Sequence, residues 1–339
     1  MPLRHFALVL LLLLCGASAT HAQPKTPADF GYRHLRMRYQ RDTVDILVLS
    51  KKGEELKRKP VFLFVQGSLP VPLIFFDAHG PYRTFPFTRK ANDYLTDYHF
   101  VIVSKPGIPL VVNAKDLQPH SFTYHDPKTG LPPVAYCQRN YLEYYASRNK
   151  AVVRYLAHQA WVEAHDITAM GHSEGAPIVA RMARHPTSLR RAIYLNGSSL
   201  GRMLTMLPSS DMTGDTTGNA AAFGRWQHIM AAPQAIDCTQ PGDSPRTTAS
   251  FSARQTPIED FQHCRIPVFV GYGTRDHAAI SNDYLHLEML RAGKQHFTFR
   301  AYPGLEHSFF GFTNGHVDYE KEHWDDVTHD FFTWMRATK

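Results

Sequence analysis

The sequence predicts an α/β fold, with a mostly parallel central sheet and helices on both faces of that sheet. Three observations lead to this prediction. Apolar runs of strand length alternate with segments of helical spacing along most of the chain. The runs "VFLFVQG" (61–67) and "YHFVIVSKPG" (98–107) are almost continuously apolar, as strands buried on both faces are. The composition, 43% hydrophobic and 20% charged, suits a large folded domain rather than a disordered chain.

The individual elements follow from the periodicity of the apolar residues. Residues 35–50 alternate apolar and polar on both sides of a turn near Arg41-Asp42, which predicts an antiparallel hairpin before the parallel strands begin. Further strands are expected at 166–172, 190–197, 266–273 and 297–302, and helices at 140–164, 176–185, 283–292 and 319–335.

Two stretches interrupt this alternation. Residues 108–135 are rich in proline and polar residues, and residues 200–262 are too long for a plain connector, with a helical patch at 223–233. The second stretch is therefore expected to be a cap or lid, inserted in one α/β domain that spans 23–339. Its Phe223 and Trp226 could contact a substrate or form the core of the cap. Residues 106–112 are further candidates for the pocket wall.

The N-terminal residues 1–22 have the pattern of a secretory signal. A basic start is followed by the short apolar run 6–15 and by small residues, with cleavage expected after Ala19 or Ala22. The run is too short to span a membrane. Bulky Leu14 argues against a lipid anchor on Cys15. We therefore expect a secreted or periplasmic protein.

Three cysteines follow the predicted signal: Cys137, Cys238 and Cys264. An exported chain permits disulfides. Cys238 and Cys264 flank one polar insertion, so they are the expected pair, with Cys137 free; the alternative is that all three are reduced. The chain contains no CxxC pair and no Cys/His cluster, so we expect no metal and no cofactor.

The formal charge of +7 is not gathered into a block of lysine and arginine, so no nucleic-acid partner is expected. No other segment is apolar enough for stable membrane insertion. The oligomeric state stays open.

The segment "GHSEG" (171–175) lies between a predicted strand and a predicted helix. A nucleophilic serine at such a junction needs a tight, strained turn, and small residues on both sides let the strand and the helix approach. The helix N-terminus adds positive potential where an oxyanion would form. Ser173 is therefore the candidate nucleophile, and the alternative is a structural turn serine.

An activated serine needs a base and an acid that orients the base. Asp276 follows the predicted strand 266–273, and His307 follows the next strand, so both lie at the sheet edge that carries Ser173. Asp276 could instead cap a helix. His316 and His323 are rival bases further from a strand end, and His277 adjoins the acid.

A tetrahedral intermediate needs hydrogen-bond donors for its oxyanion. The N–H of Glu174, directly after the serine, is one candidate. The second is expected after the strand at 61–67, where the N–H of Ser68 is favoured and that of Leu69 comes next. Gly67 lets the backbone approach a substrate, although an ordinary turn at the end of a strand is the alternative.

"GHSEG", "GTRDHA" and "GLEHSF", in this order and with "FVQGS" upstream, resemble the α/β-hydrolase superfamily, and its dienelactone hydrolase, acyl-transferase and prolyl-oligopeptidase-like branches in particular. The resemblance extends from the first hairpin to the final helix, and "VIVSKPG" is similar to a turn of some exported hydrolases. It implies Ser173, His307 and Asp276 as nucleophile, base and acid, with an oxyanion hole near Ser68 and Glu174. Gln66-Gly67 departs from the common His-Gly motif.

The resemblance implies a serine hydrolase that works through an acyl-enzyme, but one fold hosts many substrates. The expected partner is therefore a small-molecule or short-peptide acyl substrate. The first expectation is a carboxylic ester hydrolase. The alternative is a serine peptidase acting on short peptides, in which Glu174 could hold a free N-terminal amine. A non-catalytic binding protein is the third interpretation, and the ordered serine, aspartate and histidine weigh against it.

Overall fold

The computed structural model describes residues 25–84, 91–186, 188–207, 216–252 and 255–338. Its centre is an eight-stranded sheet, which is parallel except at the β1 and β2 edge. The strands, in spatial order, are β1 (Tyr32–Tyr39), β2 (Asp42–Leu49), β6 (His99–Val103), β3 (Lys59–Val65), β8 (Val162–His172), β9 (Leu189–Leu195), β10 (Val268–Gly273) and β11 (Phe297–Tyr302). The predicted fold class and the N-terminal hairpin are confirmed. The predicted signal peptide lies outside the described residues.

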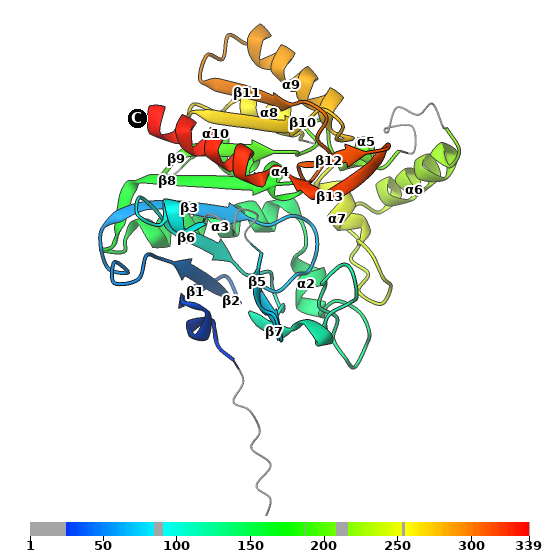
Figure 1. Ribbon diagram of the computed structural model, residues 1–339. Coiled ribbons are helices and arrows are strands. Elements are labelled where there is room, and N and C mark those ends of the chain that lie inside the picture. Colours follow the sequence, from blue (N-terminus) through cyan, green and yellow to red (C-terminus); the bar gives the residue numbers. More distant parts are fainter. Residues whose placement is uncertain (1–24, 85–90, 187, 208–215, 253–254, 339) are drawn as a thin grey trace, which may run out of the picture.

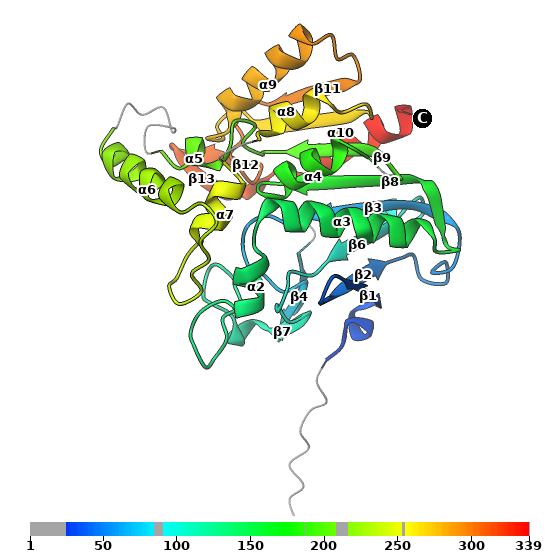
Figure 2. The same ribbon diagram turned by 180° about the vertical axis from the view of Figure 1, so that it is seen from behind.

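Helices cover both faces of the sheet. Figure 2 shows one face with α3 (Leu142–Ala157), α4 (Gly175–Ala183), α8 (Pro257–Gln262) and α9 (Ala279–Arg291), and Figure 1 shows α10 (Trp324–Ala337) across the other. The smaller helical elements are η1 (Pro27–Phe30), α1 (Ala91–Tyr94), η2 (Ala114–Asp116), α2 (Val134–Arg139), α5 (Arg202–Thr205), α6 (Asn219–Ala231) and α7 (Pro245–Ser250). Within the described ranges, no helix is long and apolar enough to cross a membrane.

The two faces of the sheet carry separate hydrophobic cores, because successive side chains of a strand point to opposite sides. In β2, Ile46 and Val48 belong to the core under α3 and α4, while Leu47 and Leu49 belong to the core under α10. The central strands β2, β3 and β6 are therefore buried on both faces, and this burial explains their nearly continuous apolar sequences.

Helix α10 closes the second core through its aromatic residues. Phe332 is fully buried, stacks on Tyr94 with ring centroids 3.9 Å apart, and packs against Phe62 and Phe100. Phe332→Ala should lower the free energy of unfolding by about 3–5 kcal/mol, the usual cost of deleting a buried phenylalanine ring. Urea unfolding followed by circular dichroism measures this loss. A change below about 1 kcal/mol would contradict this packing.

Two predicted helices are shorter than expected. Helix α3 ends at Ala157 rather than near 164, and α10 begins at Trp324 rather than 319. Residues before α10 instead form a small sheet of β12 (Phe310–Thr313) and β13 (His316–Glu322). Asn314 and Gly315 between these strands both have positive φ, which an Asn-Gly hairpin turn requires. This pair was the sequence signal for the hairpin.

The proline-rich stretches before and after β6 also contain strands that the sequence analysis did not predict. They form a second small sheet, in the order β5 (Gly80–Arg83), β4 (Ile74–Asp77) and β7 (Val111–Asn113). This sheet lies beyond the carboxyl end of β6 in both views (Figures 1 and 2). Strands this short are difficult to predict from periodicity, because each offers only three or four residues.

The described part of the insertion 200–262 contains the helices α5, α6, α7 and α8 joined by loops, and its end belongs to the main core. Phe251, Ile258 and Phe261 are buried together with side chains of α4 and α9. The earlier helix α6 extends away from the sheet and buries Ile229, while Phe223 is exposed and Trp226 is half-buried. The predicted helical patch at 223–233 corresponds to α6.

A disulfide joins Cys137 to Cys238, with the two Cα atoms 5.8 Å apart, and Cys264 is a buried free thiol. The predicted Cys238–Cys264 pair is therefore wrong. Cys264 lies directly after α8, inside the core, whereas the loop around Cys238 folds back onto α2, where Asn140 donates to Asp243 at 3.5 Å. Proximity along the chain favoured the wrong pair, because the insertion returns to the domain surface before it reaches Cys264.

Candidate active site

Ser173 lies on the turn between β8 and α4 and has a φ of 57°, a left-handed conformation that is strained for a residue with a side chain. The two glycines of the motif are required by close approach. A Cβ on Gly171 would lie 2.1 Å from the carbonyl oxygen of Gly175, and one on Gly175 would lie 2.1 Å from that of Val65. The motif thus packs the turn tightly against β3 and raises Ser173 at the carboxyl end of the sheet.

Three side chains form a chain of hydrogen bonds at this edge. His307 Nε2 lies 2.8 Å from Ser173 Oγ, and His307 Nδ1 lies 3.1 Å from Asp276 Oδ2. Asp276 is buried, and its other oxygen accepts the N–H of Ala278 at 3.2 Å. The structure therefore brings together the three residues that the sequence analysis selected. Their spacing gives the serine a base and gives the base an orienting carboxylate.

The environment of His307 favours a basic imidazole. Burial alone would lower the pKa of His307, but the hydrogen bond and the negative charge of Asp276 outweigh burial and raise it. When Nδ1–H donates to Asp276, Nε2 is free to accept the hydroxyl proton of Ser173. This protonation state requires a pH above the raised pKa of His307.

The backbone of His307 is held by two residues that the sequence analysis missed. Its carbonyl oxygen accepts hydrogen bonds from His172 Nε2 at 2.8 Å and from Asn196 Nδ2 at 2.6 Å. Asn196 Oδ1 also accepts the N–H of Gly273, at the end of the strand that leads to Asp276. One asparagine therefore ties the base loop to the strand that leads to the acid.

His172 remains neutral at this position. Burial, followed by the charge of His307, lowers the pKa of His172 to about 3. A neutral ring can donate Nε2–H to the carbonyl of His307 without placing a second positive charge beside the base. Its place inside the "GHSEG" motif was the available sequence signal.

A cavity of about 260 Å³ opens beside Ser173. It is lined by Ser68, Ser173, Glu174, Pro177, Asn196, Ser198, Arg202, Thr205, Phe251, Asp276, His277, Ala278 and His307. The insertion 200–262 contributes to this wall, as predicted. Residues 106–112 are not among the described residues of the cavity wall, because the turn after β6 packs behind the Ser68 loop, where Lys105 bonds the Ser68 carbonyl. Phe223 and Trp226 are also absent from the described wall.

The two residues predicted for the oxyanion hole, Ser68 and Glu174, both line this cavity together with Ser173. Gly67 lies directly beside the serine, since a Cβ on Gly67 would be 3.4 Å from the Cβ of Ser173. The loop after β3 therefore lies beside the serine, where the sequence analysis expected an oxyanion donor. Leu69 is 52% exposed and is not part of the described wall, so Ser68 is the better placed of the two candidates.

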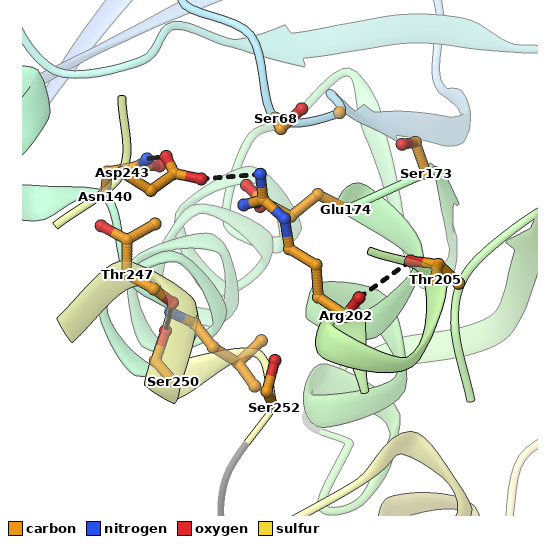
Figure 3. Close-up of polar contacts among 12 residues, drawn as sticks. Ser68, Asn140, Ser173, Glu174, Arg202, Thr205, Asp243, Thr247, Ser250 and Ser252 are labelled. Carbon is orange, nitrogen blue, oxygen red and sulfur yellow. Dashed lines mark hydrogen bonds and ion pairs between the residues drawn. The ribbon is translucent and has the colours of Figure 1, made fainter. Parts of the chain in front are cut away.

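An ionic cluster lies beside the nucleophile elbow, which is the turn that carries Ser173, and two of its members, Glu174 and Arg202, line the cavity. Arg202 of α5 bonds Glu174 Oε2 at 2.8 Å and Asp243 Oδ2 at 2.6 Å, and Figure 3 shows its guanidinium reaching towards both carboxylates. In Figure 3 the Glu174 side chain extends from the elbow away from the Ser173 hydroxyl. The carboxylate of Glu174 is thus engaged by the protein itself, and its second oxygen is buried with no hydrogen-bond partner among the described residues.

The rival histidines are placed elsewhere. His323 bonds Asp326 at 2.9 Å in an exposed pair beside α10, and His316 is an exposed residue of β13. His277 lines the cavity beside Asp276, but the hydrogen bond to Ser173 comes from His307. Across the described ranges, no group of three or more His, Cys, Asp or Glu side chains could hold a metal ion.

The sequence of the last third matches a known family. Residues 229–339 match the model of the dienelactone hydrolase family. This segment contains Asp276 and His307 but not Ser173. No curated protein matches the chain significantly.

Solved structures match nearly the whole chain at low identity. The acylaminoacyl peptidase of Pyrococcus horikoshii is 15% identical with a TM-score of 0.54, and a Bacteroides ovatus protein assigned as a dipeptidyl aminopeptidase IV is 9% identical with a TM-score of 0.59. Each match covers 91% of this chain, but only 41% and 36% of those proteins.

A third match has a similar length. A Klebsiella pneumoniae protein assigned as a dienelactone hydrolase is 14% identical with a TM-score of 0.53, and the match covers 90% of this chain and 98% of that one. The mostly parallel eight-stranded sheet and the three structural matches indicate the same fold. The protein therefore has the α/β-hydrolase fold, and its C-terminal third matches a family of hydrolases.

Proposed function

We propose that the protein is a serine hydrolase that cleaves an acyl bond through an acyl-enzyme, and that its substrates are carboxylic esters. One observation carries the proposal: Ser173, His307 and Asp276 form a continuous hydrogen-bond chain at the mouth of a cavity. The match of residues 229–339 to the dienelactone hydrolase family supports it.

In the proposed mechanism, His307 Nε2 takes the hydroxyl proton as Ser173 Oγ attacks the carbonyl carbon of the substrate. The N–H groups of Ser68 and Glu174 hold the developing oxyanion. His307 then gives the proton to the leaving alcohol, and the acyl group stays on Ser173. Water, deprotonated by His307, releases the acid and restores the serine. Asp276 orients the imidazole and stabilises its charged form.

The state of Glu174 favours esters over peptides with a free N-terminus. An aminopeptidase needs a carboxylate that can pair with the substrate ammonium. Glu174 is buried, its side chain turns away from the serine, and Arg202 already neutralises it. The alternative, a peptidase for short peptides, is supported by the peptidases among the structural neighbours.

Labelling with a fluorophosphonate tests the activated serine. We expect a covalent adduct on Ser173, identified by peptide mapping, and no adduct in His307→Ala, because the hydroxyl then lacks its base. A folded wild-type protein without an adduct would contradict the proposal. A panel of p-nitrophenyl esters and aminoacyl p-nitroanilides then separates the two substrate classes: faster turnover of the anilides would favour the peptidase.

We also propose that the protein is exported. The pattern of residues 1–22 supports this, as does the Cys137–Cys238 disulfide, since such bonds persist in oxidising compartments. Mass spectrometry of protein recovered from outside the cytoplasm should find an N-terminus at Thr20 or Gln23. A cytoplasmic protein that keeps Met1 would contradict export.

A further inference from the structure

The turn "SKPG" (104–107) after β6 has no part in the mechanism above, yet it places a lysine close to the proposed oxyanion hole. Lys105 is 5% exposed. Its Nζ donates to the carbonyl oxygens of Gly67 at 2.5 Å and Ser68 at 2.7 Å. A buried ammonium group is costly unless its charge is used or paired, so its presence behind this loop needs a physical reason.

Peptide geometry links these contacts to the site. The Gly67 carbonyl and the Ser68 N–H belong to one trans peptide, so they point in opposite directions. Because Lys105 binds the oxygen, the N–H of Ser68 faces away from Lys105, and Ser68 lines the cavity that contains Ser173. The lysine therefore determines the orientation of the amide that would meet the oxyanion.

The same contact changes the strength of this donor. A charge-assisted hydrogen bond to a carbonyl oxygen polarises the amide, and its N–H becomes a stronger donor. The Ser68 carbonyl is also held by the hydroxyl of Tyr136 at 2.7 Å, so the loop is fixed at both of its peptides. Weakening either contact should loosen the loop, but only Lys105 supplies charge.

We propose that Lys105 is a positioning residue of the oxyanion hole, which orients and polarises the Gly67–Ser68 peptide so that the Ser68 N–H can stabilise the transition state. The inference deepens the proposed function and rests on it. Lys105 is not among the described residues that line the cavity, so its effect would be transmitted through the peptide. Its loss should therefore lower kcat much more than it changes KM, because the oxyanion exists only in the transition state.

The charges around Lys105 make the effect dependent on pH. The negative charges of Glu174 and Asp243 favour the ammonium form of Lys105, and the positive charges of Arg148 and Arg202 oppose it. Nζ also lies over two tyrosine rings, 5.4 Å from the ring centroid of Tyr136 and 5.8 Å from that of Tyr145. Burial dominates and lowers the pKa of Lys105 to about 8. Above that pH the amine is neutral, and it polarises the peptide less.

The test compares the wild type with Lys105→Met, Lys105→Arg and a control, Lys59→Met. Lys59 is also buried, but it lies at the start of β3, away from the Ser68 loop that follows this strand. Its Nζ donates to the carbonyl oxygen of Leu95 and pairs with the carboxylate of Glu54. Turnover of p-nitrophenyl acetate and labelling by the fluorophosphonate are measured from pH 6 to 10. We expect Lys105→Met to lower kcat by about 10- to 100-fold, less than deletion of an oxyanion donor costs, with KM changed by less than about threefold.

The Arg variant separates positioning from a structural role. It keeps the charge at all pH values, so it should restore part of kcat, and it should not show the fall in activity above pH 8 that we expect of the wild type. Equal kcat values in Lys105→Met and Lys59→Met would overturn the inference about Lys105. If the fluorophosphonate still labelled the wild type, the proposed serine hydrolase function would be unaffected by that result. If Lys105→Met does not fold, the Arg variant decides: an alkaline fall identical to that of the wild type overturns the inference. An unlabelled wild type overturns the proposed function itself, and the inference with it.

Discussion

Ser173→Ala should abolish turnover, with a loss of kcat of at least about 10⁴-fold, because it removes the hydroxyl that is hydrogen-bonded to His307. The remaining rate would come from the cavity alone, which can still bind a substrate and its oxyanion. The fold should be unaffected, since alanine fills the same turn and the glycines of the elbow are retained. Steady-state kinetics on p-nitrophenyl esters, together with a thermal melt, measure both effects.

Ser198→Ala is the matched control, because Ser198 lines the same cavity but donates its hydroxyl to the carbonyl of Gly201 at 2.6 Å. Its turnover should stay within a few-fold of the wild type. If Ser173→Ala kept more than about one tenth of the wild-type kcat, the assignment of the nucleophile would be wrong.

Asp276→Asn should lower kcat by about 10³- to 10⁴-fold, since the amide neither fixes the correct tautomer of His307 nor stabilises its charge. It should also move the acid side of the pH profile. The wild type should lose activity as the pH falls through the raised pKa of His307, because the protonated imidazole cannot act as the base. Without the Asp276 charge this pKa falls, so the acid loss of the variant should lie at lower pH.

The exposed His323–Asp326 pair is a control of the same chemistry outside the site. Asp326→Asn should leave both kcat and the pH profile unchanged. An acid limb of Asp276→Asn at the wild-type position would show that another group controls it, and His277, beside Asp276 in the cavity wall, would be examined next.

The sequence predicts the site better than it predicts the surroundings of the site. Ser173, Asp276 and His307 each follow a parallel strand of the central sheet, and the carboxyl ends of such strands meet at one edge. Strand periodicity and chain order were therefore sufficient to bring together residues more than a hundred positions apart. The fold class could be predicted for the same reason, since apolar runs of strand length are long and unambiguous.

Contacts that depend on loops were not predictable in this way. Asn196 and Lys105 act on the site through backbone carbonyls of other segments, and no spacing in the sequence records such a contact. The disulfide was missed for a similar reason, because the path of the insertion decides which cysteine meets Cys137. The hairpin of β12 and β13 was different: its Asn314-Gly315 turn was a usable signal that helical periodicity obscured.

The Cys137–Cys238 bond also affects the unfolded chain. Its cysteines are 101 positions apart, so the bond closes a ring that contains Ser173 and Arg202 and leaves Asp276 and His307 outside. A ring of this size restricts the unfolded ensemble, and chain entropy alone gives the folded form an advantage of about 4–5 kcal/mol. Because this advantage arises in the unfolded state, it requires no rigidity at the cavity. The bond can therefore stabilise the folded domain without adding any contact to the site.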